Sequence, residues 1–243
     1  MPSINKRFGL ARILSKMGYC SRSQAAELIR AGRVTVNGRR VRDPETPVAS
    51  GSKVMIDGEP VREREKIYLA MNKPRGVVTT ASDEKGRCTV YDFLPPRHAW
   101  IGPVGRLDKA SEGLLLLTND SEWAARITDP ATHLDKTYHV QIDYVADNEL
   151  LSRIMRGAKF GDDRLSAKSA RVLRQGEKNS WLEIALDEGK NRHIRRLLET
   201  LGVGVLRLVR VSVGPLDLGN LKKGAVRSLT PLEVRALGGA SKE

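Results

Sequence analysis

Apolar residues recur at helical spacing in two short segments at the start of the chain. Residues 8–17 place an apolar side chain at every third position, and a glycine follows where a C-terminal cap belongs. Residues 22–31 repeat the pattern, with Ser21 in front of them as an N-cap and Gly32 as a stop. The chain is therefore predicted to begin with a pair of short helices.

Strand patterning and a charged stretch follow these helices. Residues 34–41 alternate around Asn37-Gly38, a dipeptide that suits a type I′ hairpin turn because both residues tolerate positive φ. Asp57-Gly58 predicts a second turn of this kind. Residues 59–66 read EPVREREK, which is typical of a linker. We therefore expect a small domain over residues 1–62 and a larger one over residues 66–238.

The larger domain mixes both periodicities. Strands are expected at residues 67–71, 113–118, 136–142, 180–186 and 205–213, and helices at residues 121–129, 148–155 and 191–202. Interleaving of this kind predicts an α+β fold. No internal repeat or heptad array is visible in the sequence.

The charge balance points to a polyanionic partner. The 243 residues include 42 Lys or Arg against 29 Asp or Glu, a formal charge of +13, which favours nucleic acid first and a membrane surface second. No run approaches the roughly 20 apolar residues that span a bilayer, and residues 1–10 lack the apolar core of a signal peptide. A cytoplasmic protein without membrane association is expected.

The first 42 residues concentrate this charge. They hold ten Lys or Arg (Lys6, Arg7, Arg12, Lys16, Arg22, Arg30, Arg33, Arg39, Arg40, Arg42) against a single acid, Glu27, a net charge of +9. Such a face supplies salt-sensitive affinity for phosphates; the alternative is the solvated surface of a basic protein. The segment SRSQAAELIRAGRVTVNGRRV resembles the alpha-L, or S4-like, RNA-binding motif. The resemblance implies RNA as the partner, with Arg12, Arg22, Arg30, Arg33, Arg39 and Arg40 as candidate contacts.

A glycine-flanked polar loop, residues 105–113, leads into an apolar run and is the densest functional signal in the chain. Catalytic groups collect in such loops. Composition alone does not choose among Asp108, Ser111, Glu112 and Asp120, each of which could be an ordinary turn or cap residue.

Four segments in order resemble the ribosomal-RNA pseudouridine synthases: NKPRGVVTT, GRLDKASEGLLLLTND, KTYHV and EGKNRHIRRL. The resemblance implies a mixed, largely antiparallel sheet with helices around it, and an enzyme that isomerises one uridine of ribosomal RNA. Large-subunit RNA is favoured and small-subunit RNA is possible. We expect a monomer. The rival interpretation is a non-catalytic RNA-binding protein of ribosome assembly.

The same resemblance implies that Asp108 is the essential carboxylate. The reaction breaks the N1–C1′ bond and joins C5 to C1′, without a redox step or an external group. A carboxylate can attack covalently or can remove the C2′ proton, and the sequence leaves both open. No cofactor is expected. The histidines His98, His133, His139 and His193 lack companions at zinc-ligand spacing, and no phosphate loop is present.

Three further residues take roles from the resemblance. Tyr138 would stack on the uracil; its alternative is an ordinary strand tyrosine. Arg195 would pair with the Asp108 carboxylate, and Arg106 would fill the place of the extruded uridine or be a second partner of Asp108. Arg192 and Arg196 are left as solvated helix charges or phosphate contacts.

Overall fold

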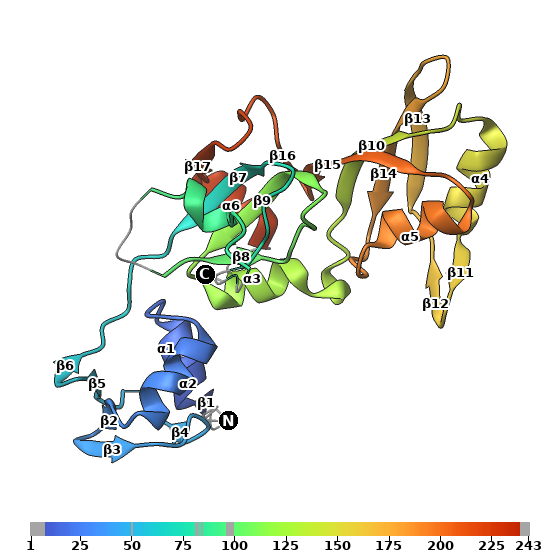
Figure 1. Cartoon of the computed structure of the whole chain (residues 1–243). Helices are drawn as coiled ribbons and strands as arrows, with labels where there is room; N and C mark the ends of the chain where they lie inside the picture. The colour runs from blue at the N-terminus through green and yellow to red at the C-terminus, as the bar shows by residue number, and fades with distance from the viewer. Residues whose placement is uncertain (1–7, 50, 81–82, 84, 96–99, 239–243) are drawn as a thin grey trace. The chain divides into compact units, whose positions relative to one another are not determined.

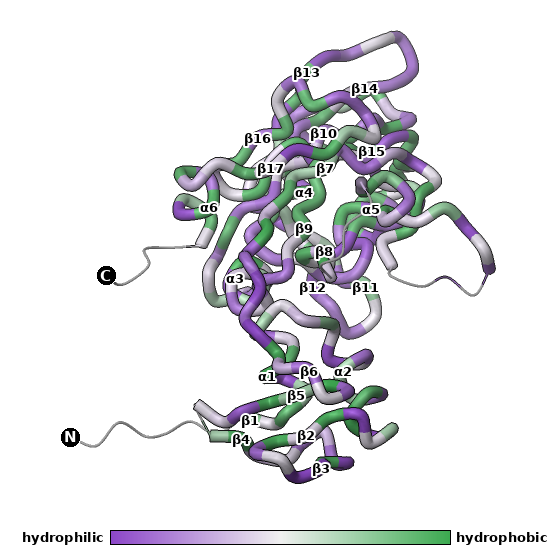
Figure 2. Tube along the Cα trace, turned by 90° about the vertical axis from the view of Figure 1, so that its left-hand side faces the viewer, coloured by the Kyte–Doolittle hydropathy of each residue, from purple (hydrophilic) through white to green (hydrophobic). Residues whose placement is uncertain are grey.

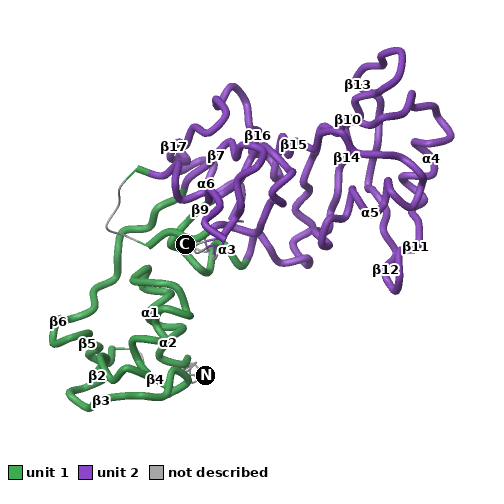
Figure 3. The backbone as a smooth tube through the Cα atoms, viewed as in Figure 1, with its two compact units in different colours: residues 1–68, 95–102, 117–125 green, residues 69–94, 103–116, 126–243 purple. Residues whose placement is uncertain are grey.

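The computed structural model describes residues 8–49, 51–80, 83, 85–95 and 100–238 (Figure 1). Lys6, Arg7 and His98 of the sequence predictions lie outside these residues. The chain divides into two compact units (Figure 3). Unit 1 comprises residues 1–68, 95–102 and 117–125, and unit 2 comprises residues 69–94, 103–116 and 126–243.

The N-terminal part of unit 1 has two helices and short strands, as predicted. Its elements are β1 (Phe8–Gly9), α1 (Leu10–Lys16), α2 (Arg22–Arg30), β2 (Val34–Val36), β3 (Arg39–Val41), β4 (Pro47–Val48), β5 (Val54–Ile56) and β6 (Glu59–Pro60). The strands form a sheet in the order β3-β2-β5-β6, and β1 pairs with β4. Ser21 caps α2 in a reciprocal capping box with Gln24. Asn37 and Asp57 adopt the predicted positive φ, 50° at each.

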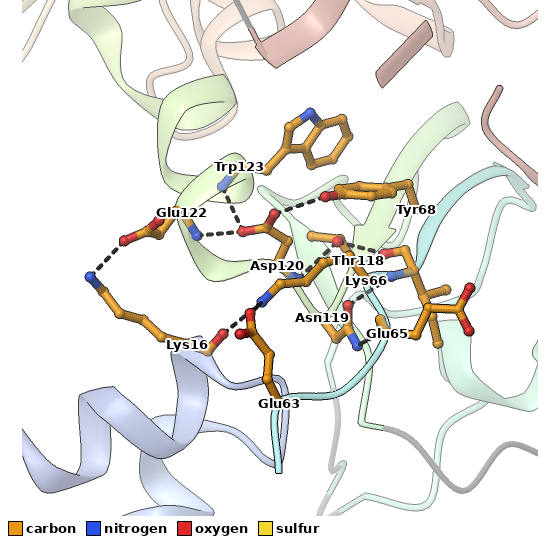
Figure 4. A network of polar contacts seen from close by, with 11 residues as sticks. Lys16, Glu63, Glu65, Lys66, Tyr68, Thr118, Asn119, Asp120, Glu122 and Trp123 are labelled. Atoms are coloured by element: carbon orange, nitrogen blue, oxygen red, sulfur yellow. Dashed lines mark hydrogen bonds and ion pairs between the residues drawn. The ribbon is translucent and has the colours of Figure 1, made fainter. Parts of the chain in front are cut away.

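The charged stretch that the sequence predicts as a linker is held by hydrogen bonds within unit 1 (Figure 4). The Lys66 ammonium donates to the carbonyl of Lys16, the last residue of α1, and the Arg64 N–H donates to that of Met17, the C-cap residue. The Asn119 amide accepts from the Ile67 N–H and donates to Glu65 O, at 2.8 Å each. These contacts cap a helix end and supply the stretch with backbone partners, so it is fixed although it contains neither helix nor strand between residues 61 and 67.

Asn119→Ala is expected to lower the free energy of unfolding by about 2 kcal/mol, because the fully buried amide satisfies two backbone groups that the alanine would leave unpaired. Chemical denaturation measures this effect. Asn220→Ala, at an exposed asparagine in a turn, is the matched control. Equal unfolding midpoints for the two variants would show that the stretch does not depend on Asn119.

A nine-stranded sheet contains most of the larger domain. Its strands are β7 (Tyr68–Lys73), β8 (Gly102–Val104), β9 (Glu112–Thr118), β10 (Lys136–Ile142), β13 (Ser169–Gln175), β14 (Ser180–Leu186), β15 (Val205–Val213), β16 (Leu216–Asp217) and β17 (Val226–Ser228). The order is β13-β14-β10-β15-β9-β7-β17, with β8 beside β9 and β16 beside β15. The β15–β9 pair is parallel, whereas β13, β14, β10 and β15 pair antiparallel. The predicted mixed, largely antiparallel sheet is confirmed.

Helices and a small hairpin complete this domain. They are η1 (Val90–Phe93), α3 (Ser121–Thr128), η2 (Pro130–Thr132), α4 (Asn148–Arg156), the hairpin β11 (Ala158–Phe160) and β12 (Asp163–Leu165), α5 (His193–Thr200) and α6 (Pro231–Gly238). Helices α4 and α5 lie beside β10 and β14 (Figure 1). Their Ile154 and Leu197 belong to one buried apolar cluster with residues of these two strands. The tip of the β13–β14 hairpin is hydrophilic (Figure 2). Within the described ranges, no helix is long and apolar enough to cross a membrane.

Candidate active site

Residues 107–111 lie between β8 and β9 and carry Asp108. All five of their carbonyl oxygens accept hydrogen bonds. The donors are Thr79 Oγ1 to Leu107 O (2.8 Å), Lys73 Nζ to Asp108 O (3.1 Å) and to Ser111 O (2.8 Å), the Gly76 N–H to Lys109 O (2.7 Å) and Arg195 Nη2 to Ala110 O (3.1 Å). Three of these four donors come from the NKPRGVVTT segment. Because each carbonyl is held, the backbone that carries Asp108 is fixed before any ligand binds.

Lys73 is the centre of this arrangement. The side chain is completely buried at the end of β7, and its ammonium also donates to Pro74 O (3.1 Å), so its three acceptors are all backbone carbonyls. Burial lowers the pKa of Lys73 to about 8, although the nearby Asp108 and Glu112 carboxylates act in the opposite direction. Lys73 is not among the site residues predicted from the sequence. The available signal was a lysine that ends an apolar strand.

The fold distinguishes the four polar candidates that composition left open. Glu112 is buried and is bound by Arg207 (3.0 Å) and Lys223 (2.6 Å). Burial alone would raise the pKa of Glu112, but these two cations outweigh it and the pKa is lowered. The Asp120 carboxylate caps α3 through the backbone N–H groups of Glu122 and Trp123. Asp108 and Ser111 are left as the candidates that line a cavity.

Tyr138 lies in β10 opposite Arg210 of β15. The Arg210 guanidinium is buried and donates from Nε to Leu114 O (2.7 Å) in β9. The neighbouring Gly113 has φ +101°, and a Cβ there would lie 2.2 Å from Arg210 O. Only glycine therefore permits β9 to approach β15 this closely. Since β10 pairs with the other edge of β15, this approach places Tyr138 one strand away from the strand that follows the Asp108 loop.

A cavity of about 540 Å³ contains three of the predicted site residues, Asp108, Tyr138 and Arg106. Asp108 and Tyr138 are half-buried, and Arg106 is exposed. Asp108 and Arg106 also line a second cavity of about 430 Å³, together with Thr79 and Lys109. The Asp108 carboxylate, the Tyr138 ring and the exposed Arg106 cation thus line a space large enough for a nucleoside.

Arg195 is not placed as the sequence predicted. The expected ion pair with Asp108 is absent: the Arg195 guanidinium donates instead to Ala110 O and to Val205 O (3.4 Å). Burial lowers the pKa of Arg195, and Arg192 and Arg75 add to this, whereas Asp108 opposes it. Arg195 is half-buried at the start of α5, where the Ala110 carbonyl is within its reach. It therefore contacts the backbone of the Asp108 loop and not its carboxylate.

No three His, Cys, Asp or Glu side chains lie close enough together to hold a metal ion among the residues that the structure describes. Both cysteines are free; Cys20 is buried and Cys88 is exposed.

Two family profiles match the chain. The S4 domain profile matches residues 8–54, and the RNA pseudouridylate synthase profile matches residues 67–200. The chain belongs to the RNA pseudouridylate synthase family. This synthase is therefore an isomerase with an N-terminal S4 domain, and the family predicted from its sequence is confirmed.

Relatives match the synthase over nearly its full length. Ribosomal large subunit pseudouridine synthase B of Bacillus subtilis (strain 168) is 36% identical over 230 residues, which cover 94% of each chain. An uncharacterized RNA pseudouridine synthase of Rickettsia prowazekii is 38% identical over 224 residues, 91% of this chain and 94% of that one. A crystal structure of a pseudouridylate synthase superposes with a TM-score of 0.67 at 29% identity and covers 95% of this chain and 99% of the other.

The S4 domain of the synthase presents most of its predicted RNA contacts to solvent. The side chains of Arg12, Arg22, Arg30, Arg39 and Arg40 are exposed. Arg33 differs, because it pairs with Asp57 through Nη2 and donates from Nε to both carboxylate oxygens. This ion pair ties the start of β2 to the β5–β6 turn and offsets the charge of Arg33. Arg33 remains exposed, and its contact with RNA stays a prediction.

Arg195→Ala is expected to lower the turnover of the synthase by about two orders of magnitude, because loss of the bond to Ala110 O loosens the loop that carries Asp108. Arg196→Ala is expected to leave turnover within about threefold. The Arg196 guanidinium pairs with Asp163 and lies over the Phe160 ring, 4.5 Å from its centroid, so this variant should mainly lose stability. Single-turnover rates at saturating RNA separate the two. Equal single-turnover rates for the two variants would show that Arg195 does not position the Asp108 loop.

Proposed function

We propose that this synthase converts one specific uridine of ribosomal RNA to pseudouridine, with Asp108 as the essential carboxylate. The observation that carries the proposal is the shared cavity of Asp108 and Tyr138 beside a loop whose five carbonyls are all bonded. Large-subunit RNA is favoured over small-subunit RNA, since the Bacillus subtilis relative is named for the large subunit. A monomer that acts in the cytoplasm is expected.

The chemistry needs a carboxylate and a pocket that retains the base. The N1–C1′ bond breaks, the uracil turns, C5 bonds to C1′, the C5 proton leaves and N1 gains a proton, so the atoms balance without an oxidant or a group donor. Asp108 would serve by attack on the sugar or base or by removal of the C2′ proton. Tyr138 would stack on the detached uracil and keep it from leaving the cavity. Arg106 would occupy the place of the extruded uridine.

The S4 domain would supply affinity without base selection. Its exposed arginines Arg12, Arg22, Arg30, Arg39 and Arg40 neutralise phosphates of folded RNA, an interaction that depends on salt and not on sequence. Selection of the single uridine would then depend on what fits the cavity at Asp108.

Mapping of pseudouridines in the ribosomal RNA of a strain that lacks this chain tests the proposal. One site is expected to revert to uridine in the large-subunit RNA and to be restored by the wild-type chain but not by Asp108→Asn. A strain with all ribosomal pseudouridines intact would contradict the substrate assignment. Restoration by both chains would contradict the role of Asp108 and favour a non-catalytic function.

A further inference from the structure

Three arginines gather beside the loop that carries Asp108. Arg75 Nη1 donates to Leu206 O (3.5 Å), and Arg195 Nη1 donates to the adjacent carbonyl, Val205 O (3.4 Å), so both are attached to the start of β15. Arg192 lines a cavity of about 390 Å³ together with Arg195. Arg75 also precedes Gly76, whose N–H donates to Lys109 O in the Asp108 loop. The cluster is therefore built on the same backbone as the candidate catalytic carboxylate.

The three side chains lack the carboxylate partner that six other arginines of the described residues have. Within the described part of the chain, none of the three forms an ion pair within 4.0 Å, whereas Arg33, Arg87, Arg171, Arg196, Arg207 and Arg227 all do. Glu199 also lines the cavity but is not bonded to either arginine there. Arg75 and Arg192 are exposed. The pKa of Arg195 is lowered mainly by burial, and the positive charges of Arg192 and Arg75 lower it further.

Like charges held together raise the free energy of the unliganded protein, and an anion that binds among them relieves the repulsion. Guanidinium groups suit a phosphate because their planar N–H donors can bind two of its oxygens at once. Both Nη atoms of Arg195 are half-buried against Ala110 O and Val205 O, whereas Arg75 and Arg192 are exposed and, among the described residues, Arg75 is held only by its 3.5 Å bond to Leu206 O. Arg75 and Arg192 are therefore the groups that can turn toward a ligand.

We infer that Arg75 and Arg192 bind a backbone phosphate of the RNA strand next to the target uridine, and that Arg195 attaches this cluster to the Asp108 loop. The inference rests on the proposed function for its location, because a uridine held at Asp108 brings its flanking phosphates to the edge of that loop. The binding itself requires only an RNA strand.

Salt-dependent binding of a fluorescent oligouridylate of about 12 nucleotides to the full chain tests the phosphate site. Each neutralised phosphate contributes about 0.7 to the slope of log affinity against log salt for a single strand. Arg75→Gln/Arg192→Gln removes the contact with one phosphate, so it should flatten the slope by about 0.7 and weaken binding about tenfold at low salt. Arg75→Lys/Arg192→Lys keeps the charges and should keep the slope.

Arg235→Ala is the matched control, because Arg235 is an exposed arginine of α6 far along the chain from this cluster. A slope for the glutamine variant equal to that of Arg235→Ala would overturn the phosphate site. Melting temperatures of all variants verify folding, and the lysine variant separates loss of charge from loss of the bond to Leu206 O.

A second experiment locates the phosphate. It uses a series of ribosomal-RNA substrate fragments, each of which carries a neutral methylphosphonate in place of one phosphate that flanks the target uridine. The wild type should lose affinity at one of these positions, and the glutamine variant should lose nothing more there. Equal losses in both proteins at every position would detach the site from the target uridine. If the wild-type chain forms no pseudouridine but the glutamine variant still flattens the salt dependence, the phosphate site is supported and the proposed function is contradicted.

Discussion

Asp108→Asn is expected to abolish pseudouridine formation while the affinity for RNA stays within about twofold of the wild type. The amide has the size of the carboxylate but neither attacks carbon nor takes up a proton. The loop should keep its position, because Lys73, Thr79, Gly76 and Arg195 bind its backbone and not the Asp108 side chain. Single-turnover conversion at saturating RNA, with a parallel binding titration, measures both quantities.

Two variants sharpen this assignment. Asp187→Asn removes another carboxylate of the same cavity and should convert uridine at a rate within about tenfold of the wild type. Asp108→Glu keeps the charge but should fail, since one extra methylene displaces the carboxylate by more than a site with sub-ångström tolerance accepts. If Asp108→Asn converts uridine at the wild-type rate, or if only Asp187→Asn loses conversion, Asp108 is not the essential carboxylate.

Lys73→Met is expected to lower turnover by about two orders of magnitude, and RNA affinity should change little. Methionine fills a similar apolar volume but donates no hydrogen bond, so Pro74 O, Asp108 O and Ser111 O lose their common partner. The Asp108 carboxylate is then still present, but it is no longer held in the position that the reaction requires. A variant with native melting behaviour and an unchanged single-turnover rate would contradict this role for Lys73.

Deprotonation of Lys73 is expected to lower turnover as the pH rises, whereas the contribution of Lys73 to the free energy of unfolding increases over the same pH range. Since burial lowers its pKa to about 8, the ammonium loses a proton and one of its three donors above that pH, and turnover should fall. Between about 8 and the ordinary value of 10.5, the unfolded chain holds the proton more tightly than the native chain, so this group makes the free energy of unfolding rise with pH. Wild type and Lys73→Met share the ionisation of uracil, so the ratio of their rates isolates this effect. A ratio that stays constant from neutral to alkaline pH would refute it.

Much of the fold was predictable because it depends on local periodicity. The strands at residues 136–142, 180–186 and 205–213 coincide with β10, β14 and β15, and the turns at Asn37-Gly38 and Asp57-Gly58 need only residues that tolerate positive φ. Several elements escaped prediction, among them β13 and the β11–β12 hairpin. They are largely exposed, and only two side chains of β13, Ala170 and Val172, pack against the core, so the apolar signal is weak. Helix α5 begins two residues late, because Arg192 adopts a left-handed conformation with φ 49°.

By itself the sequence determined the α+β class, the two helices and hairpins of the S4 domain, the basic charge and the segments that bear Asp108 and Tyr138. The tertiary structure alone decided that Asp108 and Tyr138 share a cavity, that Glu112 and Asp120 are engaged elsewhere, and that Arg195 binds Ala110 O in place of the Asp108 carboxylate. Local patterns arise from neighbours along the chain. The partner of a buried charge such as Lys73 is set by contacts 35 and 38 residues away in sequence, which no local period encodes.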